Sequence, residues 1–188
     1  MICLAQKKDA IEIAKIHKQE IKKGFLSSLP LVFLEKLYLS VIENDFCVVA
    51  KEGENVVGFM AGTKNLKKLY SFFIEKNFFY SAVILLPKIF DARKIVETLF
   101  YPKDEDIEAE LLTVAVKNNF QGKGLASKMF EVFVEEMKRN KVEVFKVLVG
   151  AELLPAINFY ENSGFKFLKE TEVHKGKKSK IYVYNLKI

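Results

Sequence analysis

The segment that most constrains this fold is Glu110–Ala126, where an apolar strand, a polar loop tightened by glycines and a helix follow one another. Its sequence is Glu-Leu-Leu-Thr-Val-Ala-Val-Lys-Asn-Asn-Phe-Gln-Gly-Lys-Gly-Leu-Ala. A loop that enters a helix in this way presents unpaired backbone N–H groups, and the positive end of the helix dipole lies behind them. Glycine permits the positive φ angles and close approach that such a turn needs. The segment therefore predicts a binding site for a diphosphate.

Two common nucleotide-binding motifs do not account for this loop. A P-loop requires Gly-x4-Gly-Lys-Ser/Thr, a string that the chain lacks. Gly122 and Gly124 supply the first two glycines of a dinucleotide fingerprint, but Ser127 stands at the third glycine position. The loop between the strand and the first glycine is also too long for that fingerprint. A third pattern, Gln/Arg-x-x-Gly-x-Gly/Ala, is filled by Gln121, Gly124 and Ala126.

A second motif follows the helix and the next strand. Pro155 suits the first turn of a helix and Gly164 suits its C-terminal end, so a helix of about two turns is predicted between them. The string Ala156-Ile-x-Phe-Tyr-Glu-x-x-Gly-Phe165 closely resembles the second signature of the GNAT family of N-acetyltransferases. The Gln121 pattern resembles the pyrophosphate loop of the same family. On these two motifs the chain is identified as a GNAT member.

The resemblance implies an acetyl-CoA-dependent N-acetyltransferase, in which a primary amine attacks the thioester directly in a ternary complex. The positions implied to bind acetyl-CoA are Val114, Val116, Gln121, Gly122, Lys123, Gly124, Ala126 and Ser127. Backbone groups of Val114 and Val116 would hold the pantetheine arm like an added strand, and the Val114 N–H would polarise the thioester oxygen. This role requires the cofactor strand to separate from its neighbour. No metal-ligand spacing is present, so no metal is expected.

Tyr160 and Glu110 are the implied catalytic residues. Tyr160 occupies the family's position for the acid that protonates the leaving thiolate. Since a phenol has a pKa of about 10 and a thiol one of about 8.5, hydrogen-bond reach matters more here than pKa matching. Glu110 occupies the position of a glutamate that deprotonates the amine in some members, and Glu108, on the same strand face, is the alternative base. Simple packing for Tyr160 and a solvated strand end for Glu110 remain open.

The expected architecture is α/β (α+β): one GNAT-like domain over residues 1–188, with a mixed, mostly antiparallel sheet of about seven strands flanked by helices. Besides the cofactor strand, strands are predicted at Ile2–Ala5, Phe46–Lys51, Asn55–Thr63, Val142–Val149, Phe165–Val173 and Ile181–Leu186. Helices are predicted after Asp9, which would cap the first, at Leu31–Ile42 and at Leu125–Asn140. Ser27 and Ser28 are expected to cap the second helix or to contact the acceptor.

A helical insertion is expected at 64–103, before the cofactor strand. Residues 64–100 read as two or three helices broken near Pro87 and Asp91, and they carry more basic than acidic residues together with six of the 17 phenylalanines. Packing on the sheet or on a second subunit, a lid over the acceptor site, and peripheral contact with a membrane surface all fit this composition. A homodimer is left open.

Composition bears on the redox state of the cysteines, the location of the protein and the charge of its partners. Cys3 and Cys47 lie in apolar runs and are expected as reduced core residues. No signal pattern or long apolar stretch is found, so a cytoplasmic protein is expected. The net charge of +6 suits CoA and an anionic acceptor, and it leaves nucleic acid open, though not expected.

The resemblance implies that the acceptor binds between the loop at Gly24–Pro30 and the lysine-rich hairpin around His174. A small-molecule or nucleotide-linked amino sugar is the leading candidate. A protein, peptide or aminoacyl-tRNA acceptor is the alternative within the enzyme class, and a non-catalytic acyl-CoA sensor is the alternative outside it.

Overall fold

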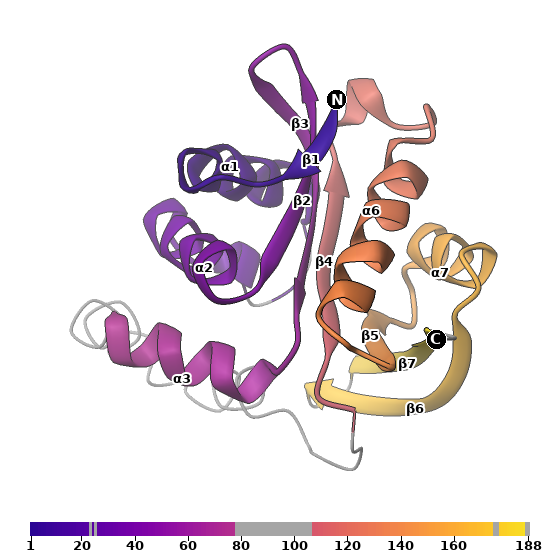
Figure 1. The fold of residues 1–188 in the computed structure, drawn as a ribbon. Coiled ribbons are helices and arrows are strands. Elements are labelled where there is room, and N and C mark those ends of the chain that lie inside the picture. Colours follow the sequence, from indigo (N-terminus) through magenta and orange to yellow (C-terminus); the bar gives the residue numbers. More distant parts are fainter. Residues whose placement is uncertain (23, 25, 78–106, 175–176, 187–188) are drawn as a thin grey trace.

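The computed structural model describes residues 1–22, 24, 26–77, 107–174 and 177–186 (Figure 1). These residues form one seven-stranded sheet in the order β1-β2-β3-β4-β5-β7-β6, with β4 and β5 parallel and the other neighbours antiparallel. The strands are β1 Ile2–Leu4, β2 Phe46–Glu52, β3 Asn55–Thr63, β4 Glu110–Val116, β5 Val144–Gly150, β6 Lys166–His174 and β7 Lys177–Asn185. The α-helices are α1 Ala10–Glu20, α2 Leu31–Asn44, α3 Leu66–Lys76, α6 Leu125–Arg139 and α7 Leu154–Asn162. The predicted α/β architecture is confirmed.

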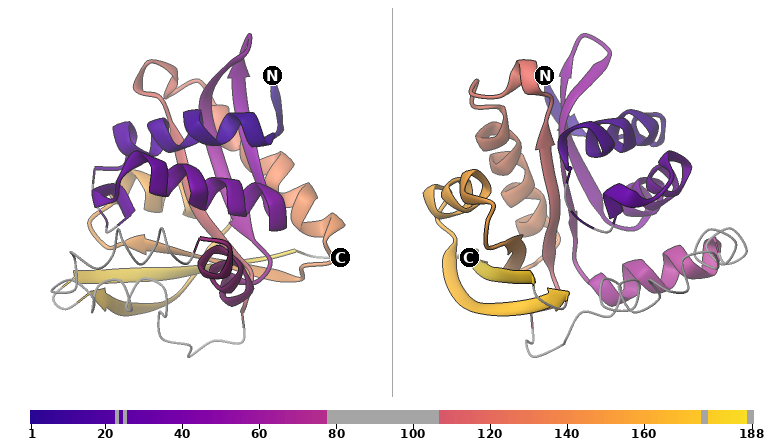
Figure 2. Two further views of the ribbon diagram at one scale, coloured as in Figure 1. Left: turned by 90° about the vertical axis from the view of Figure 1, so that its left-hand side faces the viewer. Right: turned by 180° about the vertical axis from the view of Figure 1, so that it is seen from behind.

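Helices cover both faces of the sheet. In Figures 1 and 2, α1 and α2 lie on one face and α6 on the other. Packing against α6 is close: a Cβ on Gly62 of β3 would come within 2.4 Å of the Phe133 ring. Phe133 is fully buried, and its ring makes an edge-to-face contact with Phe145 of β5, with ring centroids 5.5 Å apart. Helix α6 is therefore packed closely on β3 and β5, on either side of β4.

Two capping predictions are wrong. Asp9 precedes α1 but does not cap it, because its carboxylate accepts hydrogen bonds from the Gln6 N–H and from Lys51 Nζ, both at 2.8 Å. Neither Ser27 nor Ser28 caps α2, whose N-cap is Pro30 with no side-chain cap. The Asp9 carboxylate thus binds Gln6 and Lys51 instead of capping α1. Helix α2 takes Pro30, two residues after Ser28, as its N-cap.

The lysine-rich hairpin is more regular than predicted. Strand β7 begins at Lys177, four residues before the predicted Ile181, so its lysines lie within the strand. Lys178 and Lys180 pair in register with Glu172 and Glu170 of β6. Opposite charges directly across an antiparallel pair stabilise the ladder. These cross-strand partners explain how a polar stretch extends the strand.

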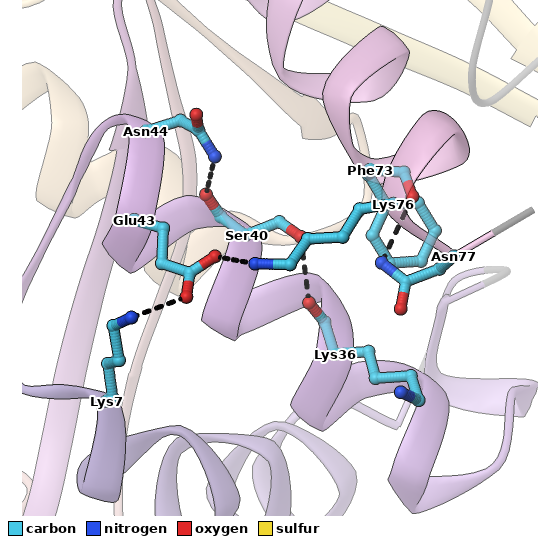
Figure 3. Close-up of polar contacts among 8 residues, drawn as sticks. All are labelled: Lys7, Lys36, Ser40, Glu43, Asn44, Phe73, Lys76 and Asn77. Carbon is cyan, nitrogen blue, oxygen red and sulfur yellow. Dashed lines mark hydrogen bonds and ion pairs between the residues drawn. The ribbon is translucent and has the colours of Figure 1, made fainter.

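Helix α3 is the described part of the expected helical insertion, and it docks on α2. Asn65 caps it by accepting the Lys68 N–H at 3.0 Å. The Glu43 carboxylate at the end of α2 binds Lys7 through one oxygen and Lys76 of α3 through the other (Figure 3). The same two helices also meet through apolar side chains, with the Phe33 and Phe73 ring centroids 5.1 Å apart. The helices predicted around Pro87 and Asp91 lie outside the described residues.

Cys3 and Cys47 are both free cysteines, and Cys47 is buried. In the described part of the chain, no helix has the length and apolar character needed to cross a bilayer.

Candidate active site

Strands β4 and β5 separate shortly after they begin. They pair only at Glu110↔Lys146 and Leu111↔Val147, whereas β4 pairs with β3 along its whole length. Beyond Leu111, the edge of β4 that faces β5 carries backbone groups with no strand partner. This is the separation that the added-strand hypothesis for the pantetheine arm requires.

A bulge in β4 determines which residues face that open edge. The register with β3 jumps from Gly62↔Leu111 to Ala61↔Thr113, so Leu112 is an extra residue. The Lys117 N–H donates to the Val57 carbonyl of β3 at 2.8 Å. Because backbone groups alternate along a strand, the N–H and C=O groups of Val114 and Val116 point the other way, toward the side that β5 has left.

The loop after β4 has the conformation that its glycines predict. Gly122 and Gly124 have φ angles of +73° and +72°, and both positions open into free space. The first helical bond of α6 runs from the Lys128 N–H to the Gly124 carbonyl at 3.1 Å, so the N–H groups of Ala126 and Ser127 lie ahead of the helical ladder. No side chain caps this helix end. These N–H groups, backed by the helix dipole, can receive an anion.

Gln121 and Lys123 differ from the other loop positions. The Gln121 side chain donates to the Val116 carbonyl at 2.8 Å, and its own N–H donates to the Asn118 carbonyl at 3.1 Å. Gln121 thus ties the loop to the open edge of β4. The exposed Lys123 lies over the Phe120 ring, with Nζ 5.0 Å from the centroid, and adds a positive charge beside the glycines.

Tyr160 lies on α7, which ends as predicted. Gly164 has φ +95°, and the Phe165 N–H returns to the Tyr160 carbonyl at 3.0 Å, forming a Schellman-type end. The Tyr160 side chain is buried and its ring packs edge-on against Phe165. Burial, and then the negative charge of Glu110, raise the pKa of the Tyr160 phenol well above its ordinary value. The phenol therefore stays protonated, as a general acid must before transfer.

Glu110 and Glu108 lie in different environments. Glu110 is buried at the start of β4, beside the buried Lys146 of β5. Strand alternation turns its side chain to the face opposite Ala109 and Leu111, which pack on the α6 side. Glu108 is exposed and its carboxylate accepts a hydrogen bond from Asn65 Nδ2 at 2.7 Å. Glu108 thus has a structural partner at the start of α3, and Glu110 is the glutamate whose charge acts on Tyr160.

Sequence reasoning missed Tyr70 of α3. Burial and the charge of Glu110 raise the pKa of its phenol. Tyr70 therefore brings a second protonated phenol into the field of Glu110, from within the inserted segment. It belongs to no motif, so only the docking of α3 on α2 reveals it.

Within the described ranges, no cluster of three or more histidine, cysteine or acidic side chains could hold a metal ion. The side chain of His174 lies outside the description.

The sequence pattern of the acetyltransferase (GNAT) family matches residues 13–165, which is most of the chain. The chain belongs to the GNAT family. The expectation of an acetyl-CoA-dependent N-acetyltransferase is thereby confirmed, while the acceptor is not determined. No curated protein matches the sequence.

Solved structures agree with the GNAT fold. An N-acetyltransferase from Staphylococcus aureus Mu50 is similar, with a TM-score of 0.67 at 18% identity, covering 98% of this chain and 100% of that one. The protein yncA from Salmonella typhimurium, solved with its cofactor acetyl-CoA, has a TM-score of 0.66 at 14% identity, covering 100% and 94%. The ribosomal-protein-S18-alanine N-acetyltransferase from Escherichia coli has a TM-score of 0.65 at 14% identity, also covering 100% and 94%.

Proposed function

We propose that this GNAT protein transfers the acetyl group of acetyl-CoA to a primary amine at the open edge of β4. The observation that supports it best is the separation of β4 from β5 directly in front of a helix start with two left-handed glycines. The backbone of Val114 and Val116 would hold the pantetheine arm. The N–H groups around Gly122–Ser127 would hold the pyrophosphate. Gln121 would orient that loop through its bond to β4.

In the proposed step, the amine nitrogen forms a bond to the thioester carbonyl carbon and the carbon–sulfur bond breaks. Glu110, through a water molecule, takes the proton that the amine loses. Tyr160 gives its proton to the departing thiolate of CoA. The Val114 N–H stabilises the oxyanion of the tetrahedral intermediate. The roles of Glu110 and Tyr160 are supported by the effect of one group's charge on the other's phenol.

We infer that residues 1–188 act as one acetyltransferase domain with an insertion at 64–103. Support comes from α3, which is docked on α2 by Glu43–Lys76 and by apolar packing. The same docking favours packing over a free membrane-binding face for this part of the insertion.

For the acceptor, we propose a small-molecule amine, with nucleotide-linked amino sugars tested first. The net charge of +6 supports an anionic acceptor. Pairing of Lys178 and Lys180 with glutamates of β6 reduces the contribution of the C-terminal hairpin to that attraction. Peptides are the second class to test, because two similar folds are named for a ribosomal-protein alanine and for a complex bound to Gag peptide.

Thiol release from acetyl-CoA, measured with nucleotide amino sugars, polyamines, peptides with free N-termini and aminoacyl-tRNA, tests this proposal. The expected result is amine-dependent release of CoA in at least one class, with acyl chains of increasing length used to define the donor. Tight binding of acetyl-CoA without turnover under any amine would instead identify an acyl-CoA sensor.

A further inference from the structure

A chain of polar side chains, buried at its centre, lies on the face of the sheet opposite α6. Ser27 Oγ, in the short 3₁₀ turn between α1 and α2, lies 3.2 Å from His17 Nε2 of α1. His17 Nδ1 lies 2.6 Å from the Tyr38 hydroxyl of α2. The Thr113 side chain on β4 lies near enough to the Tyr38 phenol to act on its pKa, lowering it against the larger effect of burial, which raises it. Side chains of four segments thus come together here, and His17 and Tyr38 are only 2% and 3% exposed.

The imidazole of His17 is neutral at physiological pH. Burial, and then the charge of Lys18, lower the pKa of His17 to about 4. A neutral imidazole has one donor and one acceptor nitrogen. If Tyr38 donates to Nδ1, Nε2–H must donate to Ser27; if Ser27 donates to Nε2, Nδ1–H must donate to Tyr38. The donor and acceptor roles in the His17–Ser27 and His17–Tyr38 hydrogen bonds therefore reverse together.

One end of this chain lies in the proposed acceptor loop, and the other lies on the strand proposed to hold the thioester. On the loop side, Lys18 Nζ donates to the carbonyls of Ser27 at 2.8 Å and Leu29 at 2.9 Å. Neighbouring residues of α1 thus fix the loop both by its backbone and by its side chain. On the sheet side, Thr113 follows the bulge residue Leu112 and directly precedes Val114, whose N–H faces the open edge.

Apolar packing alone would not require this arrangement. The surrounding core residues are aliphatic or aromatic, and replacing a buried hydrogen-bonded pair by apolar groups of the same shape is often nearly neutral for stability. A fully bonded buried network instead fixes one arrangement of the elements that it joins. Here those elements are the loop on the acceptor side and the strand that would carry the thioester.

We propose that His17 is a positioning residue for acyl transfer: through Ser27 and Tyr38–Thr113 it holds the α1–α2 loop in register with Val114, so that a bound amine meets the polarised carbonyl. This rests on the proposed function, because it assigns Val114 to the thioester. His17 does not touch the reacting atoms and acts through the residues at the two ends of the chain.

The first test uses acetyl-CoA alone and observes ¹⁵N nuclei by NMR. Backbone signals of Gly122 and Gly124 report binding at the loop, and the imidazole nitrogens of His17 report the chain. The His174→Asn variant leaves one histidine and assigns its signals. We expect both sets to shift when acetyl-CoA is added, and we expect Tyr38→Phe to abolish the His17 response while the glycine signals still shift.

The two failures can be told apart. If the glycine signals do not respond to saturating acetyl-CoA, the proposed function fails. If they respond and the imidazole does not, acetyl-CoA binding stands and the positioning role of His17 is overturned.

The second test is a double-mutant cycle in kcat, measured with the best amine from the thiol-release panel. Ser27→Ala and Tyr38→Phe should each lower kcat by about tenfold, with the KM for acetyl-CoA changed less than about twofold. Because either change interrupts the same chain, the double variant should be no slower than the slower single variant. Ser40→Ala and Tyr184→Phe, matched changes away from the chain, should leave kcat unchanged. Multiplicative effects of Ser27→Ala and Tyr38→Phe would contradict the proposal.

Discussion

The two faces of the sheet around β4 contribute to the proposed site in different ways. On the α6 side, the cofactor half consists of backbone: an open strand edge, two glycines with positive φ and a helix start without a side-chain cap. On the α1–α2 side, the acceptor half consists of side chains from several elements, among them the buried His17 and Tyr38 and the partly buried Tyr70. The cofactor half therefore depends on local backbone conformation, whereas the acceptor half depends on packing between distant segments. Each should respond to a different perturbation.

The largest expected effect is a loss of folding stability at low pH, caused by His17 in the acceptor half. Its pKa is about 4 in the folded state, against the ordinary histidine value of 6.5. Above pH 6.5 the imidazole is neutral in both states and contributes no pH dependence. As the pH falls from 6.5 to 4, the unfolded chain binds a proton that the folded protein does not, so stability should fall by up to about 3 kcal/mol. Urea unfolding at several pH values measures this, and His17→Gln should remove this slope. An identical slope in the variant would exclude His17 as its source.

Tyr160→Phe should separate chemistry from cofactor binding. Loss of the acid should lower turnover by about 10- to 100-fold, because thiolate departure loses its proton donor. Acetyl-CoA affinity, measured by calorimetry, should change little, since the cofactor half is built from backbone. Tyr184→Phe, which removes a hydroxyl from the core on the α6 side, is the control. Unchanged turnover in Tyr160→Phe would remove the acid role.

Gly124→Val should damage the cofactor half. A β-branched residue at φ +72° costs about 1–2 kcal/mol and disturbs the helix start, so the dissociation constant for acetyl-CoA should rise by about tenfold. Gly53→Val is the matched control, because Gly53 in the β2–β3 turn also has positive φ and open space around it. It should lower the melting temperature without changing acetyl-CoA affinity. Equal affinity losses in both variants would show that general strain, and not the loop, is responsible.

The smallest effect is expected at the docking of α3. Hydrogen bonds from Lys7 and then Lys76 lower the pKa of Glu43. This stabilisation is present above the ordinary glutamate pKa and is lost as the pH falls through the lowered folded value. Because such pairs near the surface contribute about 1 kcal/mol or less, Glu43→Gln should cause only a small loss of stability at pH 7 and none at low pH. A loss that persists below pH 3 would assign the effect to packing.

Sequence patterns predicted the features whose causes are local. The glycine turn, the helix from Leu125 and the α7 end at Gly164 each follow from residues a few positions apart. The errors come from contacts between elements that the patterns do not show: Lys51, far along the chain, binds Asp9, and the cross-strand glutamates of β6 accompany the extension of β7 back to Lys177. His17 falls at a core position of an amphipathic helix, so its contacts with Ser27 and Tyr38 appear only once α1 and α2 are packed. Most of the acceptor half could therefore not be predicted from the sequence.

The proposed mechanism requires Glu110 and Tyr160 to act together on a thioester held at the open edge of β4. The pH dependence of kcat/KM, compared between Glu110→Gln and Glu108→Gln with one acceptor amine, tests it most directly. We expect wild type and Glu108→Gln to share an ascending limb, and Glu110→Gln to be slow and to lose that limb. An unaltered limb in Glu110→Gln, or its loss in Glu108→Gln alone, would exclude Glu110 as the base.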